Sequence, residues 1–364
     1  WSADGRGFYF QMHTGAVAGV LTPESPVYLL RLPDTVPVST PSGESRVPGI
    51  AQLLPVSYRL ALAQDEVDAG WYVDDVAVEE GVPPTPTPSA DVGDYAVLGL
   101  NSIWLRQGSD LHSGHVGAQN ASPGPVLASN AEVTIGRNVT FHDPASAIAG
   151  DTVKLKLGAS VFDVFYNELD AASNATYGQL ITPLGLPLVT NLPPFPEVTP
   201  GATDYDVAQG EGLVLPAGAY GEIKLRRNSV LTLTGGIYHF ANLNVGERSR
   251  VRITAPTEVR IAERLEPGQR AVIGPASGSG LDASDLVVFV GGINGSSGKL
   301  GATPKAAVVG YNNVVTATIY APNGTLWLKQ GTEARGAFIG RDVKIGYNVQ
   351  VWLESGFAGG YQSP

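Results

Sequence analysis

The sequence predicts an all-β protein whose main part is a parallel, right-handed β-helix, a solenoid of short strands wound into stacked rungs. Between residues 222 and 274, runs of three to five residues alternate apolar and polar side chains, as in 230–233 (VLTL) and 251–253 (VRI). Gly, Asn, Pro or a polar pair separates these runs. Period-two alternation is typical of strands buried on one face, and strands this short and evenly spaced favour a coil over a sandwich.

The predicted solenoid occupies residues 91–364, where the same alternation recurs. Further runs at 131–136 (AEVTIG), 285–290 (DLVVFV) and 343–346 (VKIG) are typical of strands beside a turn. A rung of about twenty residues would hold two or three strands, and roughly thirteen rungs at about 4.8 Å each would form a rod of about 60 Å. The side chains expected to face the interior of the central stretch are Ile223, Leu225, Leu231, Leu233, Val251, Ile253, Val259 and Ile261.

Two proline-rich segments divide the chain. Residues 82–90 alternate Pro and Thr, which favours an extended spacer and marks a linker between a first unit, 1–81, and the solenoid. Residues 163–220 interrupt the rungs as an insertion, in which 163–169 (DVFYNEL) is the best candidate for a short helix. Because proline excludes 180–200 from a central strand, and because this segment is too apolar for a free linker, we expect it to pack along the outside of the solenoid.

The first unit ends in a recognisable strand pattern. Residues 70–78 read GWYVDDVAV, and this segment resembles the final strand of jelly-roll modules in secreted bacterial proteins, which often reads G-W-Y-x-D-D-V. The resemblance implies a small β-sandwich or jelly-roll-like unit over residues 1–81.

Four motifs in the solenoid also carry a resemblance. They are 218–221 (GAYG), 235–240 (GGIYHF), 319–324 (IYAPNG) and 336–340 (GAFIG). In this order they resemble a family of bacterial surface β-helix domains with a G-x-Y-x-F turn, a Y-A-P-N-G turn and a G-A-F-x-G rung. The similarity covers about residues 91–357. It implies a β-helix exposed on a cell surface or secreted, and it implies no particular reaction.

Composition excludes several classes of function. The chain of 364 residues carries 34 acidic and 23 basic residues, a net charge of −11, which argues against nucleic acid and anionic lipid as partners. It contains no Cys, so disulfides and thiolate metal sites are impossible. No apolar run approaches the roughly eighteen residues of a membrane span, so we expect no membrane insertion. We expect an extracellular or cell-surface protein.

The best metal candidates are two histidines, His112 and His115, whose spacing would let both reach one ion from a strand edge. No third His lies nearby in sequence, so solvent-facing turn histidines are the preferred interpretation. Asp74 and Asp75, next to Trp71 and Tyr72, would suit Ca²⁺ or a sugar, although a strand end beside a packed Trp explains them better.

Carboxylates and sequons complete the candidate sites. Asp163, Asp170, Asp204 and Asp206 suggest the acidic groove of a pectin-degrading β-helix enzyme, but they do not fall on adjacent predicted rungs. Asp282 and Asp285 are interpreted as turn and cap residues. Five N-x-S/T sequons begin at Asn120, Asn138, Asn174, Asn294 and Asn323. We therefore predict no catalytic, cofactor-binding or metal-binding residue, and no enzyme.

The first functional hypothesis is an extracellular structural subunit that assembles head to tail with copies of itself into a filament or surface layer. Residues 349–354 (VQVWLE) carry one charge and no Pro, so the C-terminal rung is expected to be an open edge that another copy can pair with. The first unit would help to clasp the neighbour. The alternative is a monomeric adhesin or carbohydrate-binding module with Trp104, Trp327 and Trp352 on its binding face. A polysaccharide lyase or hydrolase is the third hypothesis.

Overall fold

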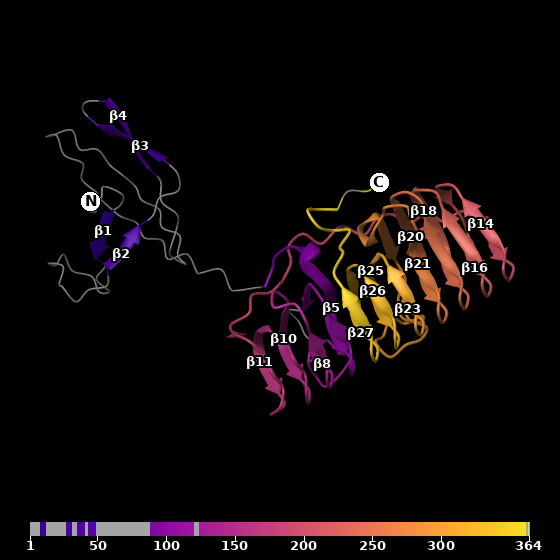
Figure 1. Cartoon of the computed structure of the whole chain (residues 1–364), viewed down its shortest axis with the longest axis horizontal. Coiled ribbons are helices and arrows are strands. Elements are labelled where there is room, and N and C mark those ends of the chain that lie inside the picture. Colours follow the sequence, from indigo (N-terminus) through magenta and orange to yellow (C-terminus); the bar gives the residue numbers. More distant parts are fainter. Residues whose placement is uncertain are drawn as a thin grey trace. The chain divides into compact units, whose positions relative to one another are not determined.

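The computed structural model describes residues 88–119, 124–361 and 363, together with four strands nearer the N-terminus (Figure 1). The chain divides into two compact units, Trp1–Thr85 and Pro86–Pro364. In the first unit, antiparallel pairs form between β1 (Phe8–Gln11) and β2 (Val27–Leu30), and between β3 (Thr35–Thr40) and β4 (Gly43–Pro48). The predicted jelly-roll strand at 70–78, with Asp74 and Asp75, lies outside the described residues.

The second unit is a β-solenoid of about thirteen turns, built from two parallel sheets. This confirms the predicted fold class. Its larger sheet contains β5 (Tyr95–Leu105), β7 (His115–Ala118), β8 (Val133–Ile135), β10 (Ala147–Leu155), β11 (Asp163–Ala171), β12 (Leu180–Ile181), β13 (Tyr205–Val207), β15 (Gly218–Ala219), β16 (Glu222–Leu225), β18 (Gly236–Val245), β20 (Thr257–Pro267), β22 (Leu286–Val290), β23 (Ala307–Val309), β25 (Thr318–Leu328) and β27 (Phe338–Ile345).

The smaller sheet contains β6 (Asp110–Leu111), β9 (Thr140–Phe141), β14 (Gly212–Leu215), β17 (Val230–Leu233), β19 (Arg250–Ile253), β21 (Val272–Pro275), β24 (Val314–Thr316), β26 (Glu333–Arg335) and β28 (Gln350–Trp352). Two single-turn 3₁₀ helices, η1 (Val92–Asp94) and η2 (Ala283–Asp285), are the helical elements of the described residues. Within that part of the chain, no helix has the length and apolar character needed to cross a membrane.

Each complete rung has three sides. The long strands of the larger sheet shift register at a bulge, for example between Phe240 and Asn242 where β18 pairs with β20. Residues before the bulge form the first face of the solenoid, and residues after it form the second face. The smaller sheet forms the third face. The three faces enclose one apolar core.

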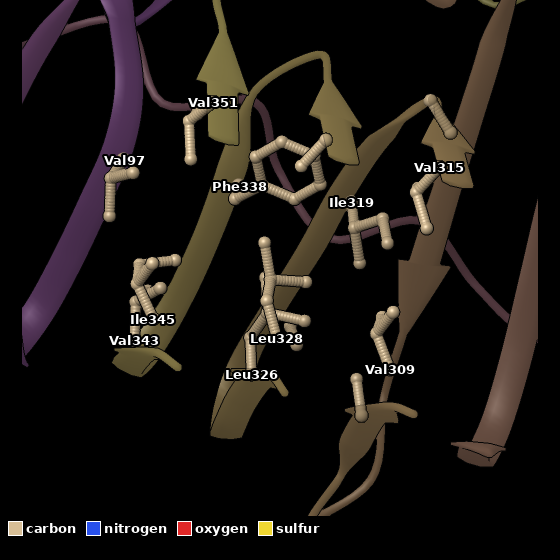
Figure 2. Packing of buried hydrophobic residues seen from close by; sticks show 14 of the residues in the cluster. Val97, Val309, Val315, Ile319, Leu326, Leu328, Phe338, Val343, Ile345 and Val351 are labelled. Carbon is tan, nitrogen blue, oxygen red and sulfur yellow. The ribbon is translucent and has the colours of Figure 1, made fainter. Parts of the chain in front are cut away.

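The core confirms the predicted interior positions. All eight apolar residues named for the central stretch are at most 2 % exposed. The strands that carry them pair in parallel with the next rung, from β16 with β18 through to β19 with β21. Figure 2 shows how Leu326, Leu328 and Val343 from successive rungs pack against one another in this core.

A single turn type joins the second face to the third. In every rung that has a strand on the second face and a strand on the third face, one residue at this corner adopts φ between 51° and 79°. Positive φ suits Gly and is tolerated by Asn, which explains why these residues separate the sequence runs. The corner residues are Gly108, Asn138, Gly158, Gly210, Asn228, Arg248, Arg270, Asn312, Gly331 and Asn348.

The rungs are not stacked in chain order. The chain enters the solenoid in its middle at β5 and winds outward to β12 at one end. It then crosses to the opposite end, starts again at β13, and winds back until β27 pairs in parallel with β5. Figure 1 shows this junction, where the yellow β27 lies beside the purple β5. We call this junction between β27–β28 and β5–β6 the seam.

Residues 182–204 form the crossing segment, which we call the strap. Leu184, Leu188 and Val189 are at most 5 % exposed and pack on the outside of the first face, in a cluster that includes Phe289 and Ile339. Hydrogen bonds attach the strap to strands near both ends of the solenoid. Asn167 Oδ1 accepts from Leu184 N (2.8 Å), and His239 Nδ1 accepts from Thr199 N (3.0 Å). The expected packing of the Pro-rich segment along the outside is confirmed.

Three expectations are corrected. Residues 163–169 form part of strand β11 and not a helix, because Val164 is buried in the core while the chain pairs with β10. The insertion is therefore only the strap, and not 163–220, since β11, β12 and β13–β15 belong to rungs. The C-terminal rung is no open edge either, because β28 pairs with β6 across the seam.

Candidate functional site

The two predicted metal candidates do not converge. His112 follows β6 and its Nε2 lies 2.6 Å from Gln350 Oε1, whereas His115 begins β7 and its Nδ1 accepts from Ala147 N (3.1 Å). Burial lowers the pKa of His115. No group of three or more His, Cys, Asp or Glu suited to a metal ion occurs within the described ranges. Each histidine therefore has a structural partner.

On the third face His112 belongs to a stacked column. Its ring lies between Trp352, with centroids 4.3 Å apart, and His142, with centroids 4.6 Å apart. Arg335 lies 4.4 Å over the same Trp352 ring and pairs with Glu354. The column crosses the seam from β26 to β9, so its contacts hold the two halves of the solenoid in register.

The four carboxylates proposed for an acidic groove are separated. Asp163 and Asp170 lie on β11, and Asp204 and Asp206 lie at β13, with nine strands between them in the larger sheet. Asp206 forms a bidentate pair with Arg226 at 2.8 and 2.7 Å, and these hydrogen bonds lower its pKa. Asp170 pairs with Lys154 at 2.5 Å. The pair on β11 and the pair at β13 therefore cannot act together on one glycosidic bond.

The capping prediction for Asp282 and Asp285 is confirmed, because the two residues form a capping box on η2. Among the sequons, Asn294 is fully buried and its amide group hydrogen-bonds Thr325. Asn138 is a corner residue with φ of 51°. Asn120 lies outside the described residues.

Two of the three tryptophans proposed for a binding face share a surface. The register places Trp327 of β25, Lys344 of β27 and Trp104 of β5 side by side on the outside of the second face. Lys344 Nζ lies 4.2 Å from the Trp327 ring centroid and 4.9 Å from that of Trp104. Trp352 is on the third face instead. The indole rings thus enclose a cation and do not offer a free flat face.

More cations and rings continue this surface along the solenoid. Lys329 lies 5.2 Å from the Tyr311 ring, and the Arg106 guanidinium lies 3.6 Å from the Tyr347 ring and 5.0 Å from that of Trp104. We call the whole set the cation–aromatic strip. It consists of Trp104, Arg106, Arg137, Lys154, Lys156, Tyr311, Trp327, Lys329, Lys344 and Tyr347.

Sequence reasoning missed the basic members of the strip. They come from segments up to 238 residues apart, and the seam brings them together. A local signal does exist, because 104–106 (WLR), 154–156 (KLK) and 327–329 (WLK) each flank one buried Leu with two outward aromatic or basic residues.

The strip contains a groove of about 490 Å³. Arg106 of the β5 rung and Lys156 of the β10 rung form its opposite walls, and Gly136 lies between them in register. A Cβ on Gly136 would lie 2.6 Å from Leu105 O, so the position admits only glycine.

The solenoid ends are the other surface relevant to function. Of ten partly buried apolar residues that pack against the main core, eight lie in the two outermost rungs at either end. They are Phe162, Tyr166, Leu169, Ala171 and Ala175 at one end, and Tyr205, Leu213 and Tyr220 at the other. No helix covers either end within the described part of the chain.

No known protein family, no curated protein and no solved structure matches this chain.

Proposed function

We propose that the protein is an extracellular structural subunit whose solenoid stacks end to end with copies of itself. The observation that carries the proposal is that both terminal rungs leave core side chains partly exposed and strand edges unpaired. Open edges are templates for further strands. Because every solenoid strand runs parallel to its neighbours, one end offers the complement of the other, and such a head-to-tail contact repeats without closing.

The edge at β14 has free backbone groups. The carbonyls of Glu211 and Leu215 accept hydrogen bonds from Val230 N and Thr234 N, so in this parallel ladder the amide of Val214 points away from the solenoid. At the other end, Thr176 N donates to Ala159 O and Thr176 O accepts from Val161 N, so both backbone groups of Thr176 face the preceding rung. The amide of Tyr177 then faces outward. The two edges can therefore continue each other's ladder.

The seam supplies a precedent for this contact. There β27 and β28 dock on β5 and β6 although about 240 residues separate them in sequence. The union combines parallel pairing and apolar core contacts, such as Phe338 with Val97 (Figure 2), with polar contacts such as Asp342 with Ser102. A stack of copies would repeat that geometry, with one subunit for each roughly 60 Å of fibre.

Charge sets the conditions for stacking. Asp170 at one end and Asp206 at the other would approach each other, but each already pairs with a cation of the adjacent inner rung, Lys154 or Arg226. The repulsion is thus reduced and not removed. We expect moderate salt to favour assembly because it screens the remaining like charges.

The test is a proline at the β14 edge of the full-length protein. Val214→Pro removes the outward amide without removing a hydrogen bond of the solenoid, and the side chain is 64 % exposed. Negative-stain microscopy and sedimentation should show fibres for the wild type and short species for the variant. Val214→Thr keeps the amide and should assemble like the wild type. A wild type that stays monomeric at its highest soluble concentration would refute the proposal, as would unchanged fibres from Val214→Pro.

A further inference from the structure

We propose that the cation–aromatic strip binds an acidic polysaccharide. The carboxylates of the polysaccharide would contact the lysines and arginines of the strip. The groove of the strip borders the β11 rung, where Asp170 and Ala172 complete its lining, but the strip's own residues lie on inner rungs, so the inference does not depend on assembly. It begins from an imbalance of charge. In a protein of net charge −11, no carboxylate of residues 88–119 or 124–361 forms an ion pair with Arg106, Arg137, Lys156, Lys329 or Lys344.

These cations are crowded as well as unpaired. Burial lowers the pKa of Lys344, and the positive charges of Arg106 and Lys305 lower it further. Like charges held this close destabilise the fold unless an anion approaches them. An anionic ligand would relieve the repulsion and would gain charge-assisted hydrogen bonds.

The aromatic rings fix where the cations point. Lys344 is held between Trp327 and Trp104, and Arg106 lies against Tyr347. A ring beside each cationic side chain restricts its rotamers, so less conformational entropy is lost on binding. The strip is thus prepared for a ligand with charges at regular intervals.

The dimensions favour an extended chain over a small anion. The cations of the strip run over five consecutive rungs, from β25 through β27, β5 and β8 to β10, which spans about 19 Å at the usual strand spacing. Its groove, which has Arg106 and Lys156 as walls and Asp170, already paired with Lys154, in its lining, would seat one or two sugar rings.

The chemistry favours a uronate polymer over nucleic acid. A polynucleotide needs a broad basic surface, and exposed aromatic faces on which bases stack. Here the ring faces of Trp104 and Trp327 are already covered by Lys344, and the rest of the chain is acidic. A single carboxylated chain with one charge per sugar fits a narrow row of cations.

The experiment measures binding of polygalacturonate to the full-length protein by calorimetry at low and moderate salt. Neutral dextran, polyphosphate and single-stranded DNA serve as comparison polymers. We expect binding of polygalacturonate that weakens with salt, and no binding of dextran. Lys156→Gln and Lys329→Gln should each reduce affinity about three- to tenfold, and the double variant more.

Lys224→Gln is the matched control, because Lys224 of β16 lies on the same face outside the strip. It should bind like the wild type. The proposal is overturned if polygalacturonate does not bind, or if polyphosphate or DNA binds more tightly. It is also overturned if Lys224→Gln loses as much affinity for polygalacturonate as the strip variants do. Because the variants leave Val214 and the terminal rungs intact, they should still assemble, so loss of binding and loss of fibres are separate outcomes.

Discussion

At the scale of single residues, the corner between the second and third faces limits what the sequence can contain. The same left-handed conformation recurs in rung after rung, and it is occupied by Gly or Asn except at Arg248 and Arg270. For most residues other than Gly and Asn, this conformation costs about 1–2 kcal/mol because the Cβ lies too close to the following carbonyl oxygen. The two arginines therefore make the solenoid less stable than Gly or Asn would at the same corner.

Replacing one of these arginines should stabilise the solenoid. Arg270 is exposed, has φ of 54° and forms no ion pair with any described residue. We expect Arg270→Gly to raise the free energy of unfolding by about 0.5–1 kcal/mol, because glycine relieves the strain but loses more backbone entropy on folding. Urea denaturation of the full-length protein measures this. A destabilised variant would show that Arg270 makes a contact that outweighs its strain.

Glycines that follow the second face have a different role, since they allow close approach of adjacent rungs. A Cβ on Gly310 would lie 2.1 Å from Gly268 O. Gly310→Ala should therefore lower the free energy of unfolding by about 1–3 kcal/mol through forced displacement of a rung. Gly301→Ala is the control, because nothing lies within 4 Å of its Cβ position. Equal melting temperatures for the two variants would contradict this account.

At the scale of elements, the strap connects the two ends of the solenoid and so allows its rungs to stack in an order that differs from the chain order. It crosses the outside of the first face and covers apolar side chains that would otherwise meet water. Leu188 is 1 % exposed and sits directly over Gly117, where an added Cβ would be 2.6 Å from Leu188 Cδ1. A strap that fits this closely acts as part of the fold and not as a tether.

Truncating Leu188 tests that statement. Leu188→Ala should lower the free energy of unfolding by about 2–4 kcal/mol and make residues 182–204 the first site of limited proteolysis. Thr190→Ala, an exposed change in the same segment, should do neither. If protease cleaves wild type and Leu188→Ala at the same rate, the strap is held by its hydrogen bonds alone.

The elements also show what the sequence could predict. Rungs were predictable because alternation such as 230–233 and the Gly or Asn corners are local signals. Their order was not, since each rung carries the same alternation and could pair with any other. The strip was missed for the same reason, because Lys344 meets Trp104 only through the seam. The helix prediction for 163–169 is wrong because Phe165 and Leu169, four residues apart, fit one face of a helix over so short a run.

At the scale of the whole molecule, the solenoid consists of two coils that meet at the seam. One coil runs from β5 to β12 and the other from β13 to β28, and the strap is their covalent link. In a solenoid each rung contacts only its neighbours, so stability is close to a sum over adjacent interfaces. The interface at the seam therefore decides whether the two coils unfold together.

A buried polar contact distinguishes this interface. Asp342 of β27 is 1 % exposed, and its Oδ1 accepts from Ser102 Oγ (2.7 Å) and Asn101 Nδ2 (2.6 Å) of β5. Its Oδ2 accepts from Arg341 Nε (2.9 Å). Such a contact specifies which rung docks on β5, because another rung would leave these buried groups without partners.

Removing the carboxylate should weaken the seam selectively. Asp342→Ala leaves the buried Ser102 hydroxyl without its acceptor and removes the ion-pair partner of Arg341, at a cost of about 3–5 kcal/mol. Hydrogen exchange should then become fast in β27 and β5 while β18 and β20 keep their protection, because the inner rungs of each coil retain both neighbours. Val259→Ala, a core truncation inside the second coil, should instead raise exchange around β20 and leave β5 protected. Uniform loss of protection in Asp342→Ala would mean that the two coils form one cooperative unit and that the seam is not its weakest interface.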